Sequence, residues 1–168
     1  MPAQRYTSMH QRPAASNWAA IPLRLIVGYG FIVHGYLKLA RGPERFAAVL
    51  AALRVPAPAL MSWLTIGIEI VGGLAILAGA FVILMSIPLA TVLVVAAVTV
   101  HLPFGFSSIK LLAVSADGAQ FGKPGYELDL LYLACLVALV LGGSGPLAVD
   151  TYLSNRTGKL RAAQRASS

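Results

Sequence analysis

Arg24-Leu-Ile-Val-Gly-Tyr-Gly-Phe-Ile-Val-His-Gly-Tyr-Leu-Lys38 is an apolar stretch that nevertheless carries three ionisable side chains. At about 100° per residue, Arg24, His34 and Lys38 fall within about a third of a helix circumference. A charged side chain at mid-bilayer costs about 3 kcal/mol or more, so such groups usually face a protein interior or a wet cavity. The stretch therefore predicts a membrane helix whose polar face packs against other helices.

The composition also indicates a membrane protein. Of the 168 residues, 58% are hydrophobic and 11% are charged, and the mean hydropathy is +0.77, whereas soluble domains have about 25% charged residues. The net charge is +7, but the basic residues are spread over loops and termini, so we expect contact with anionic lipid headgroups and no nucleic-acid binding. Cys135 is the only cysteine, which excludes an internal disulfide or a thiolate metal cluster, and we predict no metal site.

Four apolar runs approach the length of about 20 residues that a helix needs to cross a membrane. They cover residues 18–39, 60–80, 81 or 85 to 101, and 127–141. These runs predict an all-α membrane protein, a four-transmembrane-helix up-and-down bundle. Between the first two runs, Gly42-Pro43-Glu44 begins a segment with apolar residues at helical spacing. That segment is too short to span, so we expect a short interfacial helix.

The remaining segments divide the chain into three parts. We expect a polar N-terminal segment at 1–17, a membrane domain at 18–150 and a basic, disordered tail at 151–168. The connection 102–125 is longer than the others, and long connections are often functional or mobile. Pro88 should kink the third helix, since proline removes a backbone hydrogen bond.

The charge distribution does not orient the protein, because six Lys and Arg residues fall on each expected side of the membrane. An even number of spans places both termini on one side. Without a recognisable cleaved signal, we expect that side to be the cytoplasm and the location to be the inner cell membrane.

Ionisable side chains from all four expected helices should lie in one half of the bundle. They are His34, Lys38, Glu69, His101 and Glu127. At 1.5 Å per residue, three of them lie near one membrane face, with His34 about 6 Å deeper than Lys38 and Glu69 about 13 Å below the start of its helix.

Two ionisable residues are expected to lie outside this cluster. Arg24 falls toward the opposite face, where it could reach the headgroups. Asp129 lies nearly opposite Glu127 around the fourth helix, so it should contact the interface or a partner.

The cluster admits two interpretations. Intramembrane charges usually pair, so these residues could simply tie the helices together. They could instead line a pocket for a small redox or transported molecule, in which case His34, Glu69 and His101 are the candidates for catalysis. Two histidines on different helices permit haem ligation, but no haem motif accompanies them, and haem is not expected.

Several short motifs occur in a characteristic order. They are Leu-Arg-Leu at 23–25, Phe31-Ile-Val-His34-Gly35 with Lys38, Glu69-Ile-Val-Gly72-Gly73-Leu, His101 before Phe104-Gly105, Glu127, and Gly143-Ser-Gly145 with Asp150. In this order and spacing, the chain from 24 to 150 resembles the DoxX family of small bacterial membrane proteins. That family is named after a subunit of an archaeal thiosulfate:quinone oxidoreductase. The resemblance implies a membrane subunit of a redox complex, with its site at the matched ionisable positions, including Arg24.

Our main hypothesis is a subunit of a quinone-linked oxidoreductase. His34 or His101 would hydrogen-bond a quinone carbonyl, Glu69 would relay protons, and Lys38 would hold the developing charge, while Glu127 completes the cofactor-binding set. Electrons would come from a soluble or membrane partner protein. The chain would otherwise contact the lipid bilayer and a second copy of itself.

Two alternatives remain from the residues alone. The chain could be a non-catalytic anchor or assembly subunit that docks a partner enzyme through the connection 102–125. It could also be a small transporter. The kink expected at the proline of the third helix and the intramembrane Glu69 suggest this alternative.

Overall fold

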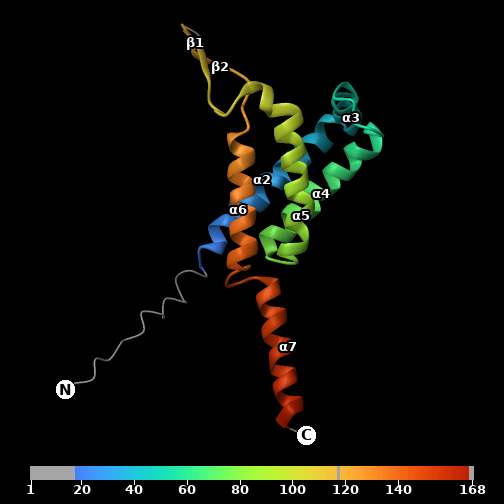
Figure 1. The fold of residues 1–168 in the computed structure, drawn as a ribbon, viewed down its shortest axis with the longest axis vertical. Coiled ribbons are helices and arrows are strands. Elements are labelled where there is room, and N and C mark those ends of the chain that lie inside the picture. The colour runs from blue at the N-terminus through green and yellow to red at the C-terminus, as the bar shows by residue number, and fades with distance from the viewer. Residues whose placement is uncertain (1–17, 117, 167–168) are drawn as a thin grey trace, which may run out of the picture.

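The computed structural model describes residues 18–116 and 118–166, which are mostly helical (Figure 1). Three helical segments are long and apolar enough to cross a membrane: α2 (Ala20–Arg41), α4 (Pro58–Ala78) and the segment Val82–Phe104. The third begins as α5 (Val82–Ala96) and continues through a π-helical turn (Ala97–His101) and a 3-10 turn (Leu102–Phe104). These segments confirm a helical membrane protein, and the predicted segment 1–17 lies outside the described residues.

The remaining elements connect or extend these three segments. The short helix predicted between the first two spans is α3 (Pro43–Ala52). After the third come strands β1 (Leu111–Ser115) and β2 (Gly118–Phe121), then α6 (Glu127–Gly142) and α7 (Val149–Ala166).

Glycine and proline set the boundaries between consecutive helices. Gly42 ends α2 with φ at 97°, and Pro43 starts α3, because proline fits the first helical turn and cannot continue the previous helix. Gly79 ends α4 with φ at 67°, and its N–H group bonds back to Ile76 O. The chain then reverses into α5.

Small residues bring α2 against α4. A Cβ atom on Gly28 would lie 2.8 Å from the carbonyl oxygen of Gly73, and one on Gly35 would lie 2.7 Å from the Ile70 side chain. Such close approach is typical of helix packing in membranes, where van der Waals contact replaces the hydrophobic driving force. α2 and α4 therefore form one closely packed pair.

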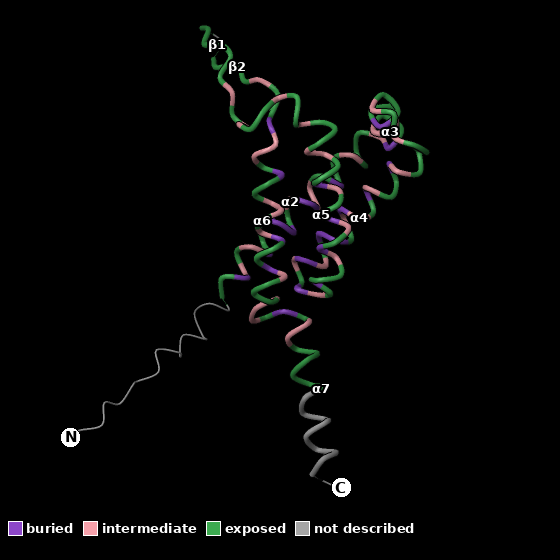
Figure 2. Tube along the Cα trace, in the orientation of Figure 1, coloured by how far each residue is buried: buried purple, intermediate pink, exposed green. Residues whose placement is uncertain are grey.

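The second pair is α5 and α6, and the two pairs share a core. Val27 and Phe31 of α2, Ile76 of α4, Leu89 of α5 and Leu136 of α6 are all nearly inaccessible. Figure 1 shows α7 leaving the helices at the end opposite the β-hairpin. Figure 2 shows exposed residues along the outer faces of the helices and buried residues where the helices meet.

The outer faces are apolar. Leu25 and Tyr29 of α2, Val71 of α4, Ile87 of α5 and Leu141 of α6 are all more than half exposed. A soluble protein rarely leaves so much contiguous apolar surface open to water. The exposed residues are therefore suited to contact lipid.

Two segments differ from the expectations. Residues 102–125 contain an antiparallel hairpin, with Leu111 opposite Phe121 and Ser115 opposite Gly118. The sequence signal for this hairpin is Asp-Gly at 117–118, a pair common in tight hairpin turns. The tail predicted to be disordered is helical through Ala166. Its second half, residues 159–166, consists of Lys, Leu, Arg, Ala and Gln, which all favour helix.

The glycine contacts predict a difference between two alanine substitutions. Gly28→Ala should lower the free energy of unfolding by about 2 kcal/mol, because the added methyl group would overlap the α4 backbone. Gly67→Ala is the matched control, since no atom lies within 4 Å of its Cβ position, and alanine there should be neutral or stabilise by up to about 1 kcal/mol. Unfolding in mixed detergent micelles followed by circular dichroism measures both. Equal effects of the two substitutions would contradict the packing described here.

Candidate functional site

Lys38 and Glu69 form an ion pair between α2 and α4. The Lys38 Nζ atom lies 2.5 Å from each carboxylate oxygen of Glu69, and the Glu69 side chain is only 4% exposed. Gly35, one turn before Lys38, allows this approach because it brings α2 close to the Cβ atom of Glu69 and the carbonyl oxygen of Ile66. Phe46 of α3 covers the pair, with its ring centroid 5.0 Å from Nζ. The two charges therefore neutralise each other under an aromatic cover.

His101 and Asp129 form a second pair, between the end of the third segment and α6. The His101 Nδ1 atom lies 2.5 Å from Asp129 Oδ2; the carboxylate side chain is 8% exposed and the imidazole 27%. A carboxylate bound to one ring nitrogen orients the imidazole and supports a proton on it, so the other nitrogen can act on a ligand. His101 also closes a π-helical turn, a rare conformation that often occurs at functional sites.

Glu127 does not take the position expected for it in the cluster. Its carboxylate accepts a hydrogen bond from the backbone N–H of Ser108 at 2.9 Å, and the Ser108 hydroxyl accepts one from the N–H of Leu128. These bonds tie the connection to the first turn of α6. Asp129, predicted to face an interface or a partner, is instead the α6 residue that reaches His101. Two residues along a helix rotate a side chain by about 200°, so only one of the two can face α5.

His34 is exposed, although we expected it to be packed. The buried stripe of α2 contains Arg24, Gly28, Phe31 and Gly35, and His34 lies about 80° around the helix from Arg24. It follows Gly30 by one turn, on the flank of α2 that contacts Tyr132 of α6. His34 therefore belongs to the side of α2 that faces α6, but outside the closely packed part.

Arg24 is buried at the opposite end of the helices rather than extended to the surface. Its guanidinium group donates hydrogen bonds to Ile76 O and Leu77 O of α4. It also donates to the carbonyl groups of the turn between α6 and α7, at Ser144, Pro146 and Leu147. The resemblance placed Arg24 among the site positions, whereas its contacts are with backbone.

Asp150 lies at the same end and was noted in the sequence only as part of a motif. Its carboxylate accepts hydrogen bonds from the backbone N–H groups of Phe81 and Val82, and from the Ser144 hydroxyl. Its own N–H donates to Gly79 O. Asp150 thus caps α5 and attaches α7 to the turn between α4 and α5. Helix capping across a sequence separation of nearly 70 residues leaves no local signal.

In the part of the chain that the structure describes, no group of three or more His, Cys, Asp or Glu side chains is placed to hold a metal ion. Four of the ionisable residues form two pairs instead, Lys38 with Glu69 and His101 with Asp129. Each pair joins two neighbouring helical segments.

A family model described as DoxX matches residues 19–102, half of the chain. The matched range includes Lys38, Glu69 and His101, whereas Asp129 and α6 follow it. No curated protein and no solved structure matches the chain.

The Lys38–Glu69 pair predicts strong coupling between two substitutions. Lys38→Met should destabilise the protein by about 3 kcal/mol, because it leaves the buried Glu69 carboxylate unpaired, and Glu69→Leu should destabilise it less, because Lys38 is partly exposed. The double variant should lose less than either single variant, since an apolar pair carries no uncompensated charge. Unfolding of all four proteins in micelles measures the coupling energy. Additive losses would show that the two charges do not depend on each other.

Proposed function

We propose, because this chain belongs to the DoxX family, that it is the integral membrane subunit of a redox complex and binds a quinone headgroup beside His101. The observation that carries this proposal is the contact between the partly exposed imidazole and the buried Asp129 carboxylate. A histidine supported in this way is suited to general acid–base chemistry in a desolvated site.

The donor set near His101 is compatible with a quinone. A bound quinone supplies a carrier that takes up two electrons and two protons. The second ring nitrogen of His101 can hydrogen-bond a carbonyl oxygen and deliver a proton, and Asp129 holds the imidazole ring in position through the first nitrogen. The aromatic residues Phe104 and Phe106 follow His101 after Leu102 and Pro103. The electrons would come from a partner protein.

The other predicted site residues take different roles in this proposal. Lys38 and Glu69 form an ion pair with each other, so we assign them to holding α2 against α4. In this proposal Lys38 does not balance the charge of the quinone, and Glu69 does not relay its protons. Glu127 anchors the start of α6. His34 remains a candidate ligand, because it is exposed on the flank of α2 that faces α6.

We also propose that α6 is a fourth membrane span, which completes the four-helix bundle. Its residues Leu136 and Leu139 are buried against the other helices, while Leu131, Val137 and Leu141 on its outer side are exposed. Four spans place the start of α2 and the α7 end of the bundle on one side of the membrane, which we propose to be the cytoplasmic side of the inner membrane. α3 would lie at the opposite interface.

Quinone binding by the purified full chain tests the proposal. His101→Phe and Asp129→Asn should each weaken binding of a short-chain ubiquinone analogue about tenfold, since the first removes the hydrogen bond and the second removes the charge that supports it. Thr99→Val is the control on the same π-helical turn, because the Thr99 hydroxyl bonds only to Val95 O among the described residues. Equilibrium dialysis in detergent measures the affinity. Unchanged binding by both site variants would rule out a site at His101.

The hairpin favours a second function, that of an anchor for a partner enzyme. It projects beyond the helices (Figure 1), and Leu112, Val114 and Phe121 on it are all at least 60% exposed. Apolar side chains at such a projection suit protein–protein contact.

The anchor role predicts that charged substitutions in the hairpin remove the partner protein. Leu112→Glu with Val114→Glu should remove the partner that co-purifies from native membranes but leave quinone binding intact, because charges there prevent burial at an interface. Gln120→Glu is the control. It adds one negative charge at a position of β2 that is already polar, so this variant should retain the partner. Quantitative mass spectrometry of the purified complexes compares the three proteins. Retention of the partner by the double variant would exclude the hairpin as the docking surface.

A further inference from the structure

Tyr132 of α6 places its phenol hydroxyl group against the backbone of α2. A Cβ atom on Gly30 would overlap the Tyr132 hydroxyl oxygen, so any other residue at position 30 would displace the hydroxyl. The Tyr132 ring also packs against the buried Phe31 ring in a T-shaped arrangement, with the ring centroids 5.7 Å apart. These two contacts hold the ring, so α2 sets the position of the hydroxyl group.

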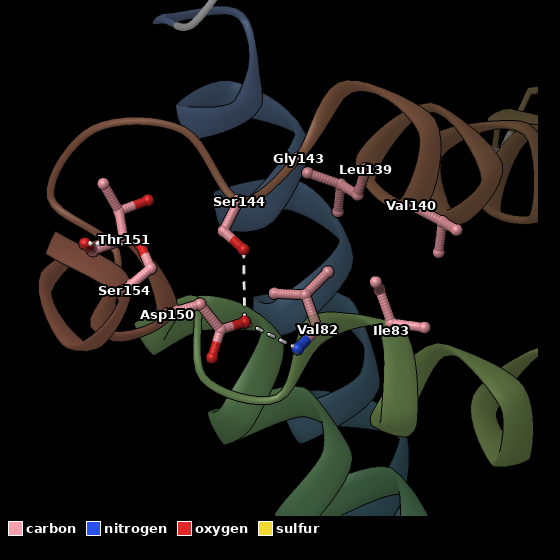
Figure 3. Close-up of a pocket in the computed structure, with 9 residues that line it drawn as sticks. All are labelled: Val82, Ile83, Leu139, Val140, Gly143, Ser144, Asp150, Thr151 and Ser154. Atoms are coloured by element: carbon pink, nitrogen blue, oxygen red, sulfur yellow. Dashed lines mark hydrogen bonds between the residues drawn. The ribbon is translucent and has the colours of Figure 1, made fainter. Parts of the chain in front are cut away.

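The Tyr132 hydroxyl has no hydrogen-bond partner among the residues that the structure describes, whereas every fully buried side-chain oxygen and nitrogen of those residues has one. Tyr132 is partly buried, so its hydroxyl oxygen keeps some accessible surface. A polar group without a partner in apolar surroundings is unfavourable, and a ligand that accepts its hydrogen bond removes this cost. The groove at the opposite end of the bundle differs, because the Asp150 carboxylate there already accepts hydrogen bonds from Val82 and Ser144 (Figure 3).

Tyr132 lies one helical turn from the ion pair at the proposed quinone site. It follows Asp129 by three residues, and side chains at this spacing are neighbours on a helix surface, with Cβ atoms about 5–6 Å apart. Asp129 in turn contacts His101. Tyr132 lies about 7.5 Å along α6 from its first residue, Glu127. The same side of α6 therefore brings together an imidazole and, one turn deeper in the bundle, a phenol hydroxyl.

The depth of Tyr132 and the chemistry of its hydroxyl both suit a quinone headgroup. A phospholipid keeps its polar groups at the boundary of the hydrocarbon region, whereas a quinone carries two carbonyl oxygens on an apolar ring. Both oxygens are hydrogen-bond acceptors, and the Tyr132 hydroxyl has a donor to offer. We propose that Tyr132 is the second hydrogen-bond donor of the quinone site, binding one carbonyl oxygen while His101 binds the other. This assignment rests on the proposed quinone function and adds the residue that orients the ring.

Infrared difference spectroscopy tests the assignment, with the purified full chain in detergent and a short-chain ubiquinone analogue labelled with ¹³C at one carbonyl carbon or the other. A hydrogen bond weakens a C=O bond and lowers its stretching frequency, so we expect both carbonyl bands to lie below their frequencies in unbound quinone. Tyr132→Phe should return one band to the unbound frequency, and His101→Phe should return the other. A purely structural role of Tyr132 would not shift one band alone.

Equilibrium dialysis of the same variants measures the contribution of the hydroxyl to affinity. Tyr132→Phe should weaken quinone binding about tenfold and leave unfolding in micelles unchanged. Gly30→Ala should weaken binding similarly, because the added methyl group displaces the hydroxyl, and the double variant should bind no more weakly than either single variant. Tyr29→Phe is the matched control, since Tyr29 is the neighbour of Gly30 and is 65% exposed, and it should bind like the unaltered chain.

The results for Tyr132 and for the quinone site itself can be told apart. Quinone binding that is weakened by His101→Phe but keeps both carbonyl bands lowered in Tyr132→Phe would overturn the role of Tyr132 and leave the site at His101 in place. An unaltered chain that binds no quinone would overturn both proposals.

Discussion

The buried guanidinium group of Arg24 is the contact on which the arrangement of helices depends. Ile76 and Leu77, which accept two of its hydrogen bonds, are in the last turn of α4, where carbonyl groups lack the N–H partner that a continuing helix would supply. The negative end of the α4 dipole also favours a cation there. Because Arg24 donates to the α6–α7 turn as well, one side chain joins α2, α4 and the end of α6. Its burial is compensated mainly by backbone oxygens.

Asp150 supplies the opposite half of the same arrangement. It binds the free N–H groups at the start of α5, where a carboxylate is favoured by the positive end of a helix dipole. Arg24 and Asp150 thus satisfy the end of one helix and the beginning of the next across the turn at Gly79. Among the described residues, the side-chain hydrogen bonds that join the α2–α4 pair to the α5–α6 pair lie at this end of the bundle.

The opposite end is held differently. There, Lys38 with Glu69 joins α2 to α4, and His101 with Asp129 joins the third segment to α6, so each ion pair acts within one pair of helices. The end that contains Arg24 and Asp150 therefore has a structural role, whereas the other end presents the partly exposed imidazole of His101 to a ligand. The proposed quinone site uses the second end.

The sequence by itself determined the membrane character, the three long apolar segments and the short helix after Gly42, because each of these follows from local composition and helical periodicity. Only the tertiary structure decided that Asp129 rather than Glu127 reaches His101, that His34 lies outside the packed stripe, and that Arg24 binds backbone carbonyl groups. Those outcomes depend on the rotation of one helix relative to another and on free polar groups at helix ends that are distant in sequence. A residue pattern records which side chains share a face of one helix, but it does not record which neighbour that face meets.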